Sequence, residues 1–124
     1  MGFASAWLEG NTIFPRLILA EPDPETGIII VIPSYGEGSI GATVDSIAKC
    51  TPPACRCEVI VVVNAPADAP EKLREENKRT ISYLNAWSAL DKSHFRLFLC
   101  TPDTSHIPGW GVGHARKTGM DEAV

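Results

Sequence analysis

The chain alternates between short apolar runs and longer segments in which apolar residues recur every three or four positions. Residues 28–32 are consecutive β-branched residues, and residues 58–63 and 95–100 are two further, largely apolar runs. A strand without polar alternation is typically buried on both faces, as in a parallel sheet covered by helices. The pattern therefore predicts three buried parallel strands.

Helices are predicted between and after these strands. The apolar positions of residues 39–49 form one stripe, with Ser39 as the capping residue. Pro70 suits a first helical position, with Asp68 as a cap, and a long helix follows to about residue 90. A loop over residues 101–110 leads to a third helix that starts near Gly113. The order β-α-β-α-β-loop-α is half of a doubly wound α/β domain with right-handed crossovers.

Residues 1–26 differ from the rest of the chain. They carry a roughly helical apolar stripe interrupted by Gly10 and Pro15, followed by a linker rich in turn-forming residues. We expect an N-terminal helical extension and linker over residues 1–26, packed on a domain that spans residues 27–124.

The composition narrows the classes of partner. The 124 residues include 44% hydrophobic and 21% charged residues, and the formal net charge is -4. Nucleic-acid binding is not expected, because neutralising phosphates needs a basic face. No apolar run reaches the roughly 20 residues that span a bilayer, and no secretory signal is present, so a cytoplasmic location is the default.

Cysteines and histidines give little sign of a metal site. The spacing Cys55-Arg-Cys57 does not match the C-x₂-C pair typical of zinc, and Cys100 falls in a predicted buried strand. Reduced thiols without a special role are the favoured interpretation, with no metal ligands and no catalytic residues assigned.

Polar motifs follow all three predicted strands. Residues 33–37 come after the first strand, residues 64–68 after the second, and the loop of residues 101–113 after the third. Ligands of open parallel sheets bind outside the carboxyl ends of the strands. We therefore expect the turns bearing Tyr35 and Asn64 and the loop that leads to Arg116 to surround one cleft.

One interpretation of this edge is a nicotinamide dinucleotide site. The glycines in Gly36-Glu37-Gly38-Ser-Ile-Gly41 match the spacing G-x-G-x-x-G between a strand and a helix. Residues 33–35 intervene where the dinucleotide turn is tight, and Glu37 would set a carboxylate close to a pyrophosphate. The second strand also ends in Asn64 rather than in the acid that holds a ribose. This interpretation is kept as the alternative.

The set of motifs resembles the N-terminal half of family 2 glycosyltransferases. The segments that carry the resemblance are Ile30-Val-Ile-Pro33-Ser-Tyr35-Gly-Glu37, Glu58-Val-Ile-Val-Val-Val63-Asn64 and Gly113-His-Ala-Arg116-Lys117-Thr-Gly119. The resemblance covers residues 27–124 and implies a Rossmann-like three-layer sandwich of the GT-A type, with a mainly parallel sheet truncated after the third βα unit. It implies a nucleotide-sugar transferase, of which this chain is the donor-binding half.

The resemblance also implies a set of nucleotide-sugar-binding residues. Tyr35 lies near the base or ribose, Glu37 accepts from a ribose hydroxyl, and Asn64 stands where the family usually has a base-reading aspartate. An amide both donates and accepts, so it can pair with the edge of either uracil or guanine. The full set is Pro33, Tyr35, Glu37, Asn64, Asp68, Gly113 and Arg116.

The same resemblance implies parts that residues 1–124 do not supply. The family holds a divalent cation, Mg²⁺ or Mn²⁺, with an Asp-x-Asp motif, and this sequence has no such motif and no candidate catalytic base. We therefore expect a fragment that binds a UDP- or GDP-linked sugar for an unknown acceptor and that is inactive alone. The full-length protein would suit the inner face of a membrane.

The remaining alternative is a non-catalytic interaction module. Independently of function, an exposed sheet edge predicts self-association.

Overall fold

A computed structural model describes residues 12, 14, 17–18, 24–36, 38–49, 55–88, 95–104, 107 and 109–123. Its elements are β1 (Thr26–Ser34), α2 (Ile40–Lys49), β2 (Arg56–Val63), α3 (Glu71–Ser88), β3 (Phe95–Cys100) and α4 (Val112–Ala123). The predicted order of strands and helices is confirmed, and the third strand has the predicted bounds. The prediction that residues 1–26 form a helical extension falls mostly outside the described residues.

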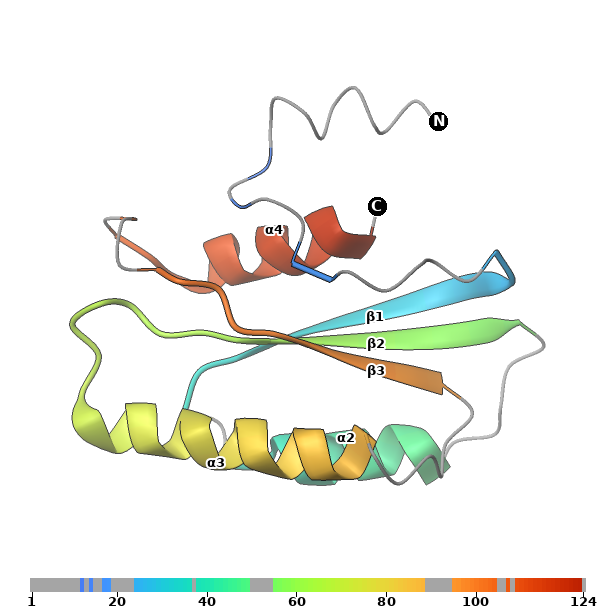
Figure 1. The fold of residues 1–124 in the computed structure, drawn as a ribbon, viewed down its shortest axis with the longest axis horizontal. Helices are drawn as coiled ribbons and strands as arrows, with labels where there is room; N and C mark the ends of the chain where they lie inside the picture. Colours follow the sequence, from blue (N-terminus) through green and yellow to red (C-terminus); the bar gives the residue numbers. More distant parts are fainter. Residues whose placement is uncertain are drawn as a thin grey trace.

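The three strands form one parallel sheet in the order β1-β2-β3. Neighbouring strands pair in register, with Ile30 opposite Val59 and Val59 opposite Leu97. Helices α2 and α3 cover one face of the sheet, and α4 covers the other, so the fold has three layers (Figure 1). The molecule is therefore an α/β protein compatible with a Rossmann-like unit.

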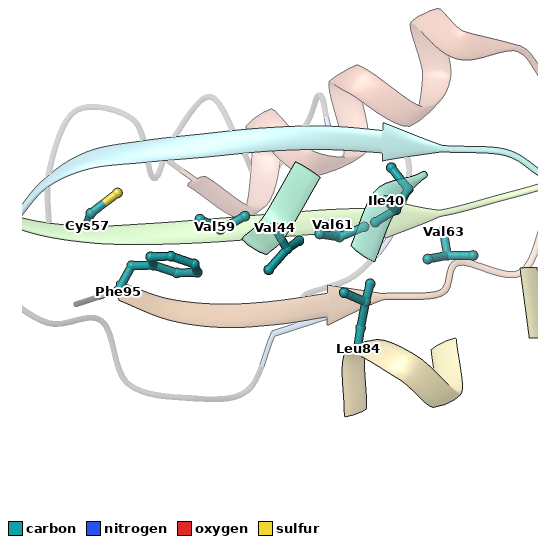
Figure 2. Packing of buried hydrophobic residues seen from close by; sticks show 8 residues of the cluster. All are labelled: Ile40, Val44, Cys57, Val59, Val61, Val63, Leu84 and Phe95. Carbon is teal, nitrogen blue, oxygen red and sulfur yellow. The ribbon is translucent and has the colours of Figure 1, made fainter. Parts of the chain in front are cut away.

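Alternate residues of β2 separate two hydrophobic cores. The first core lies between the sheet and the pair α2 and α3 (Figure 2), and its buried members are Ile40, Val44, Cys57, Val59, Val61, Val63, Leu84 and Phe95. The second core lies under α4, where Ile60 and Val62 of β2 meet Ala115. Both faces of β2 are buried because helices cover both, as its continuous apolar run predicts.

The prediction that β1 is buried on both faces is wrong for its first half. Ile28 is 42% exposed and Ile29 is 37% exposed, whereas the residues of β2 from Cys57 to Val63 are all buried. The reason is position in the sheet: β1 lies at one edge of the described strands, so only β2 flanks it. An unbroken β-branched run reports the hydrophobicity of a strand but not whether the strand is central or at an edge.

The helix α4, which follows β3 in the chain, packs over the other two strands of the sheet. α4 packs against β1 and β2, and Gly119 lies against Val31 of β1 and Val62 of β2. Its N-terminal end lies at the carboxyl end of the strands (Figure 1). The helix α4 thus lies on the face of the sheet opposite to α2 and α3, and it begins at the carboxyl edge, outside which open α/β sheets bind their ligands.

A short stretch near the N-terminus is attached to the far end of α4. The carboxylate of Glu122 accepts hydrogen bonds from the backbone N–H groups of Leu17 at 2.6 Å and Ile18 at 3.1 Å. Both residues, with Phe14, also pack on the second core. Phe14, Leu17 and Ile18 therefore pack against the rest of the described structure, and the division into an extension and a domain stays a prediction.

Candidate functional site

Asn64 joins three chain segments at the carboxyl edge of the sheet. Its backbone N–H donates to the carbonyl of Ser34 at 2.9 Å, and its side-chain Nδ2 donates to the same carbonyl at 3.0 Å. Its Oδ1 accepts a hydrogen bond of 2.9 Å from the indole N–H of Trp110, which precedes α4. The turns after β1 and β2 and the loop before α4 therefore meet at this edge, whereas a single cleft shared by Tyr35, Asn64 and Arg116 stays a prediction.

Hydrogen bonds of two further residues connect this edge to α3 and to the loop after β3. Asn77 of α3 is 7% exposed; its Oδ1 accepts from the N–H of Gly36 at 2.8 Å, and its Nδ2 donates to the carbonyl of Asn64 at 2.9 Å. The hydroxyl of Thr104, in the loop after β3, donates to the carbonyl of Ala65. The ends of all three strands are thus held in one hydrogen-bonded rim, defined here by Gly36, Asn64, Asn77, Thr104 and Trp110.

A pocket of about 300 Å³ opens beside this rim. It lies between the end of β2, the N-terminal half of α3 and the loop after β3. Its polar lining comes from Asn64, Arg74, Asn77, Asp103 and Thr104, and Val63, Ile81 and Pro102 supply apolar walls. A concave site with a few convergent polar groups on apolar walls is the usual form of a small-molecule site.

One buried polar group at the end of β1 is left without a partner. The Ser34 side chain is fully buried, and its hydroxyl makes no hydrogen bond within the described part of the chain. Burying an unsatisfied hydroxyl costs about 1–3 kcal/mol. This edge is therefore not arranged for stability alone.

The predicted base contact of Asn64 stays a prediction, and the structure gives the residue an additional role. Asn64 lines the pocket, but both ends of its amide are used internally, since Nδ2 also donates to the carbonyl of Val62 at 3.0 Å. A 6% exposed amide with three internal hydrogen bonds positions the turns around it. The sequence alone does not reveal the burial or the partners of Asn64, so it could not distinguish this positioning role from direct ligand contact.

Pro33, Tyr35 and Asp68 lie near the rim and do not line the pocket. Pro33 and Tyr35 are half-buried at the end of β1, and Asp68 is exposed in the β2–α3 turn. Glu37 lies outside the described residues. Pro33, Tyr35 and Asp68 thus occupy the predicted edge, and their ligand contacts stay predictions.

At the start of α4 the side chains divide into internal and exposed groups. Trp110 is 7% exposed and stacks on His114, so it packs the loop. Lys117 forms an ion pair of 3.0 Å with Asp121. Gly113 and Arg116 are exposed, and within the described residues Arg116 has no ion pair. Arg116 is therefore the cation of this helix that is available to a ligand.

The glycine-rich turn after β1 serves helix packing. Gly36 has a φ of 61°, a region that favours glycine, and a Cβ there would lie 2.5 Å from Leu73. A Cβ on Gly41 would lie 2.7 Å from the ring of Tyr83. Both glycines therefore admit side chains of α3, a use that does not require a dinucleotide.

Sequence reasoning missed Arg74, Asn77 and Thr104. Asn77 had a usable signal, because it interrupts the inward stripe of α3 between Leu73 and Ile81 with a polar side chain of low helix propensity. Arg74 is a cation in the first turns of a helix, where the macrodipole disfavours positive charge. Thr104 gave no signal, because its partner, Ala65, is distant in sequence.

No protein family matches this chain, and neither does any curated protein or solved structure. Within the described residues, no three His, Cys, Asp or Glu side chains lie close enough to hold a metal ion. No helix in the described part of the chain is long and apolar enough to cross a membrane. The class of protein is thus defined by its three-layer α/β fold and by the rim and pocket at the carboxyl edge of its sheet.

The thiol of Cys100, the last residue of β3, provides a test of burial below the rim. Burial, with a smaller contribution from the charge of Glu122, raises the pKa of this thiol to about 11 from its ordinary value of 9.0. The unfolded chain therefore loses this proton at lower pH than the folded chain does, and ionisation of the thiol favours unfolding. We expect Cys100 to lower the free energy of unfolding progressively as the pH rises from 9 to 11.

Urea unfolding at a series of pH values checks this expectation. Cys100→Ala should flatten the decline above pH 9, whereas Cys55→Ala, at an exposed position, should leave the slope unchanged. Equal slopes in the wild type and Cys100→Ala would show that the thiol does not contribute.

Proposed function

We propose that this protein binds a nucleotide diphosphate sugar at the carboxyl edge of its sheet, as the donor-binding part of a glycosyltransferase of the GT-A type. The observation that carries the proposal is the meeting of three turns at Asn64, on the side where α4 crosses back to β1. Open α/β sheets bind ligands outside the carboxyl ends of their strands. The resemblance to family 2 glycosyltransferases supplies the class of ligand.

The chemistry of the edge supports an anionic ligand on the α4 side. The first turn of α4 has backbone N–H groups without helical partners, and a helix N-terminus favours negative charge. Arg116 adds a full positive charge one turn further along, on an exposed position. Tyr35, half-buried on the adjacent turn, offers a ring and a hydroxyl for a nucleoside. A diphosphate near Arg116 and a nucleoside near Tyr35 would use both groups.

The divalent cation and the catalytic base of the proposed reaction are not assigned to residues of this chain. Their chemistry, neutralising the leaving diphosphate and deprotonating the acceptor hydroxyl, is what an inverting transfer needs. The proposal for residues 1–124 is therefore binding rather than turnover.

Calorimetric titration of the 124-residue chain with UDP and GDP in the presence of Mg²⁺ tests the proposal. One of the two should bind, and Arg116→Gln should weaken binding by about tenfold, the cost of one charge-assisted hydrogen bond. Lys78→Gln, which removes an exposed charge from the outer face of α3, is the matched control and should change little.

Two results would count against the proposal. The absence of heat with any nucleotide diphosphate would remove the donor-binding function. Tighter binding of NADH than of UDP and GDP would favour the dinucleotide alternative instead.

A further inference from the structure

The guanidinium of Arg74, which lines the pocket, is hydrogen-bonded to the turn between β2 and α3. Its Nε donates to the carbonyl of Ala69 at 3.0 Å, and its Nη2 donates to the carbonyl of Ala67. These two bonds fix the plane of the group against the turn. A guanidinium has five N–H donors, so three of them remain for a ligand.

No acidic side chain neutralises Arg74 among the described residues. Ion pairs between described residues join Arg79 to Glu76, Arg96 to Glu58, and Lys117 to Asp121, and Arg74 takes part in none of these three. Arg74 bonds only to uncharged carbonyl groups, and it lines the pocket with its positive charge intact. A fixed, unneutralised guanidinium with spare donors is suited to bidentate binding of an oxyanion.

The pocket also contains a negatively charged side chain. Asp103 is the acid among the lining residues, and it follows Pro102 in the loop after β3. A bare phosphate would be repelled by this carboxylate, whereas a hydroxyl group would donate to it. Val63 and Ile81 add apolar surface to the lining. The lining thus combines a positively charged hydrogen-bond donor, a negatively charged hydrogen-bond acceptor and an apolar wall.

We propose that this pocket binds a phosphoryl group joined to a hydroxyl-bearing chain or ring, that is, a sugar phosphate. Arg74 holds the phosphoryl oxygens, and Asp103 accepts from a hydroxyl of the sugar. The volume of about 300 Å³ accommodates one sugar ring with its phosphate. The site goes beyond the proposed function, which places its diphosphate near Arg116 on the other side of the rim.

Heteronuclear NMR titration of the full chain with ribose 5-phosphate, orthophosphate and ribose tests the site. Ribose 5-phosphate should bind most tightly and should shift the backbone amide signals of the non-proline residues 64, 65, 67–69, 103 and 104. Arg74→Gln should weaken ribose 5-phosphate binding by at least about tenfold, since a charge-assisted bidentate contact is lost. Arg79→Gln removes the same charge from an exposed position of α3 and should leave the affinity within about twofold.

Two further variants keep the test decisive if Arg74→Gln loosens the turn. Arg74→Lys keeps the positive charge but loses the planar group that binds an oxyanion through two N–H donors. Its affinity for ribose 5-phosphate should therefore fall between those of the wild type and Arg74→Gln. Asp103→Asn should strengthen binding of orthophosphate and reduce the preference for ribose 5-phosphate over orthophosphate, because it removes the repulsion and weakens the acceptor.

The outcomes separate this site from the proposed function. Equal affinities of Arg74→Gln and Arg79→Gln for ribose 5-phosphate would overturn the site, as would signal shifts confined to α4. Loss of ribose 5-phosphate binding in Arg74→Gln with unchanged UDP or GDP binding would establish the site as separate. Binding of ribose 5-phosphate without binding of any nucleotide diphosphate would retain the site and remove the donor-binding function.

Discussion

Replacing Asn77 by leucine is expected to lower the free energy of unfolding by about 2–4 kcal/mol, because one buried and one partly buried backbone group lose their partners. The side chain of Asn77 accepts from the N–H of Gly36 and donates to the carbonyl of Asn64. Leucine has a similar size but cannot replace either bond. The hydrogen bonds that join Asn77 of α3 to the turns after β1 and β2 would then be lost.

Urea unfolding followed by far-UV circular dichroism measures this loss. Asn85→Leu is the matched control, since Asn85 is exposed on the same helix, and a surface substitution of this kind changes stability by less than about 0.5 kcal/mol. Similar unfolding midpoints for the two variants would show that the rim bonds do not contribute to stability.

Replacing Gly119 by alanine is expected to cost about 1–3 kcal/mol, the usual penalty for overpacking a close contact. A Cβ at this position would overlap the Cγ1 atom of Val31 and would lie 3.0 Å from the Cγ2 atom of Val62. β-branched side chains are stiff, so neither can rotate away easily. The helix α4 would have to move away from the sheet.

The same substitution in the same helix provides the control. Around Gly113 a Cβ would meet no atom within 4 Å, and Gly113→Ala should therefore stabilise the protein by up to about 1 kcal/mol through helix propensity. In thermal or urea unfolding, Gly119→Ala should lower the free energy of unfolding and Gly113→Ala should raise it.

A double-mutant cycle identifies the contact responsible. Val31→Ala in the Gly119→Ala background should recover part of the loss, because it removes the overlapping methyl groups. Strict additivity of the two substitutions would contradict the steric explanation.

The secondary structure was largely predictable from local patterns. The apolar runs of residues 58–63 and 95–100 fall within β2 and β3, since buried parallel strands require continuous hydrophobicity. Pro70 precedes α3, which begins at Glu71, and Ser39 precedes α2, which begins at Ile40. Such signals are local, because capping and backbone restrictions act within a few residues.

The candidate site was predicted only as a location. The rule that ligands bind at the carboxyl ends of strands needs only the element order, and it located Asn64 and the loop before α4 correctly. It could not assign the neighbours of each side chain. Arg74 and Asp103, which line the pocket together, are far apart in sequence and meet only because α3 and the loop after β3 lie beside each other.

The sequence by itself determined the alternation of strands and helices and the edge at which polar residues gather, because hydrophobic periodicity and turn chemistry act along the chain. Only the tertiary structure decided that β1 lies at the edge of the described sheet, that Asn64 is enclosed by internal hydrogen bonds, and that Arg74 faces a pocket. Those properties depend on which distant segments pack together, and packing partners are not encoded in any local pattern.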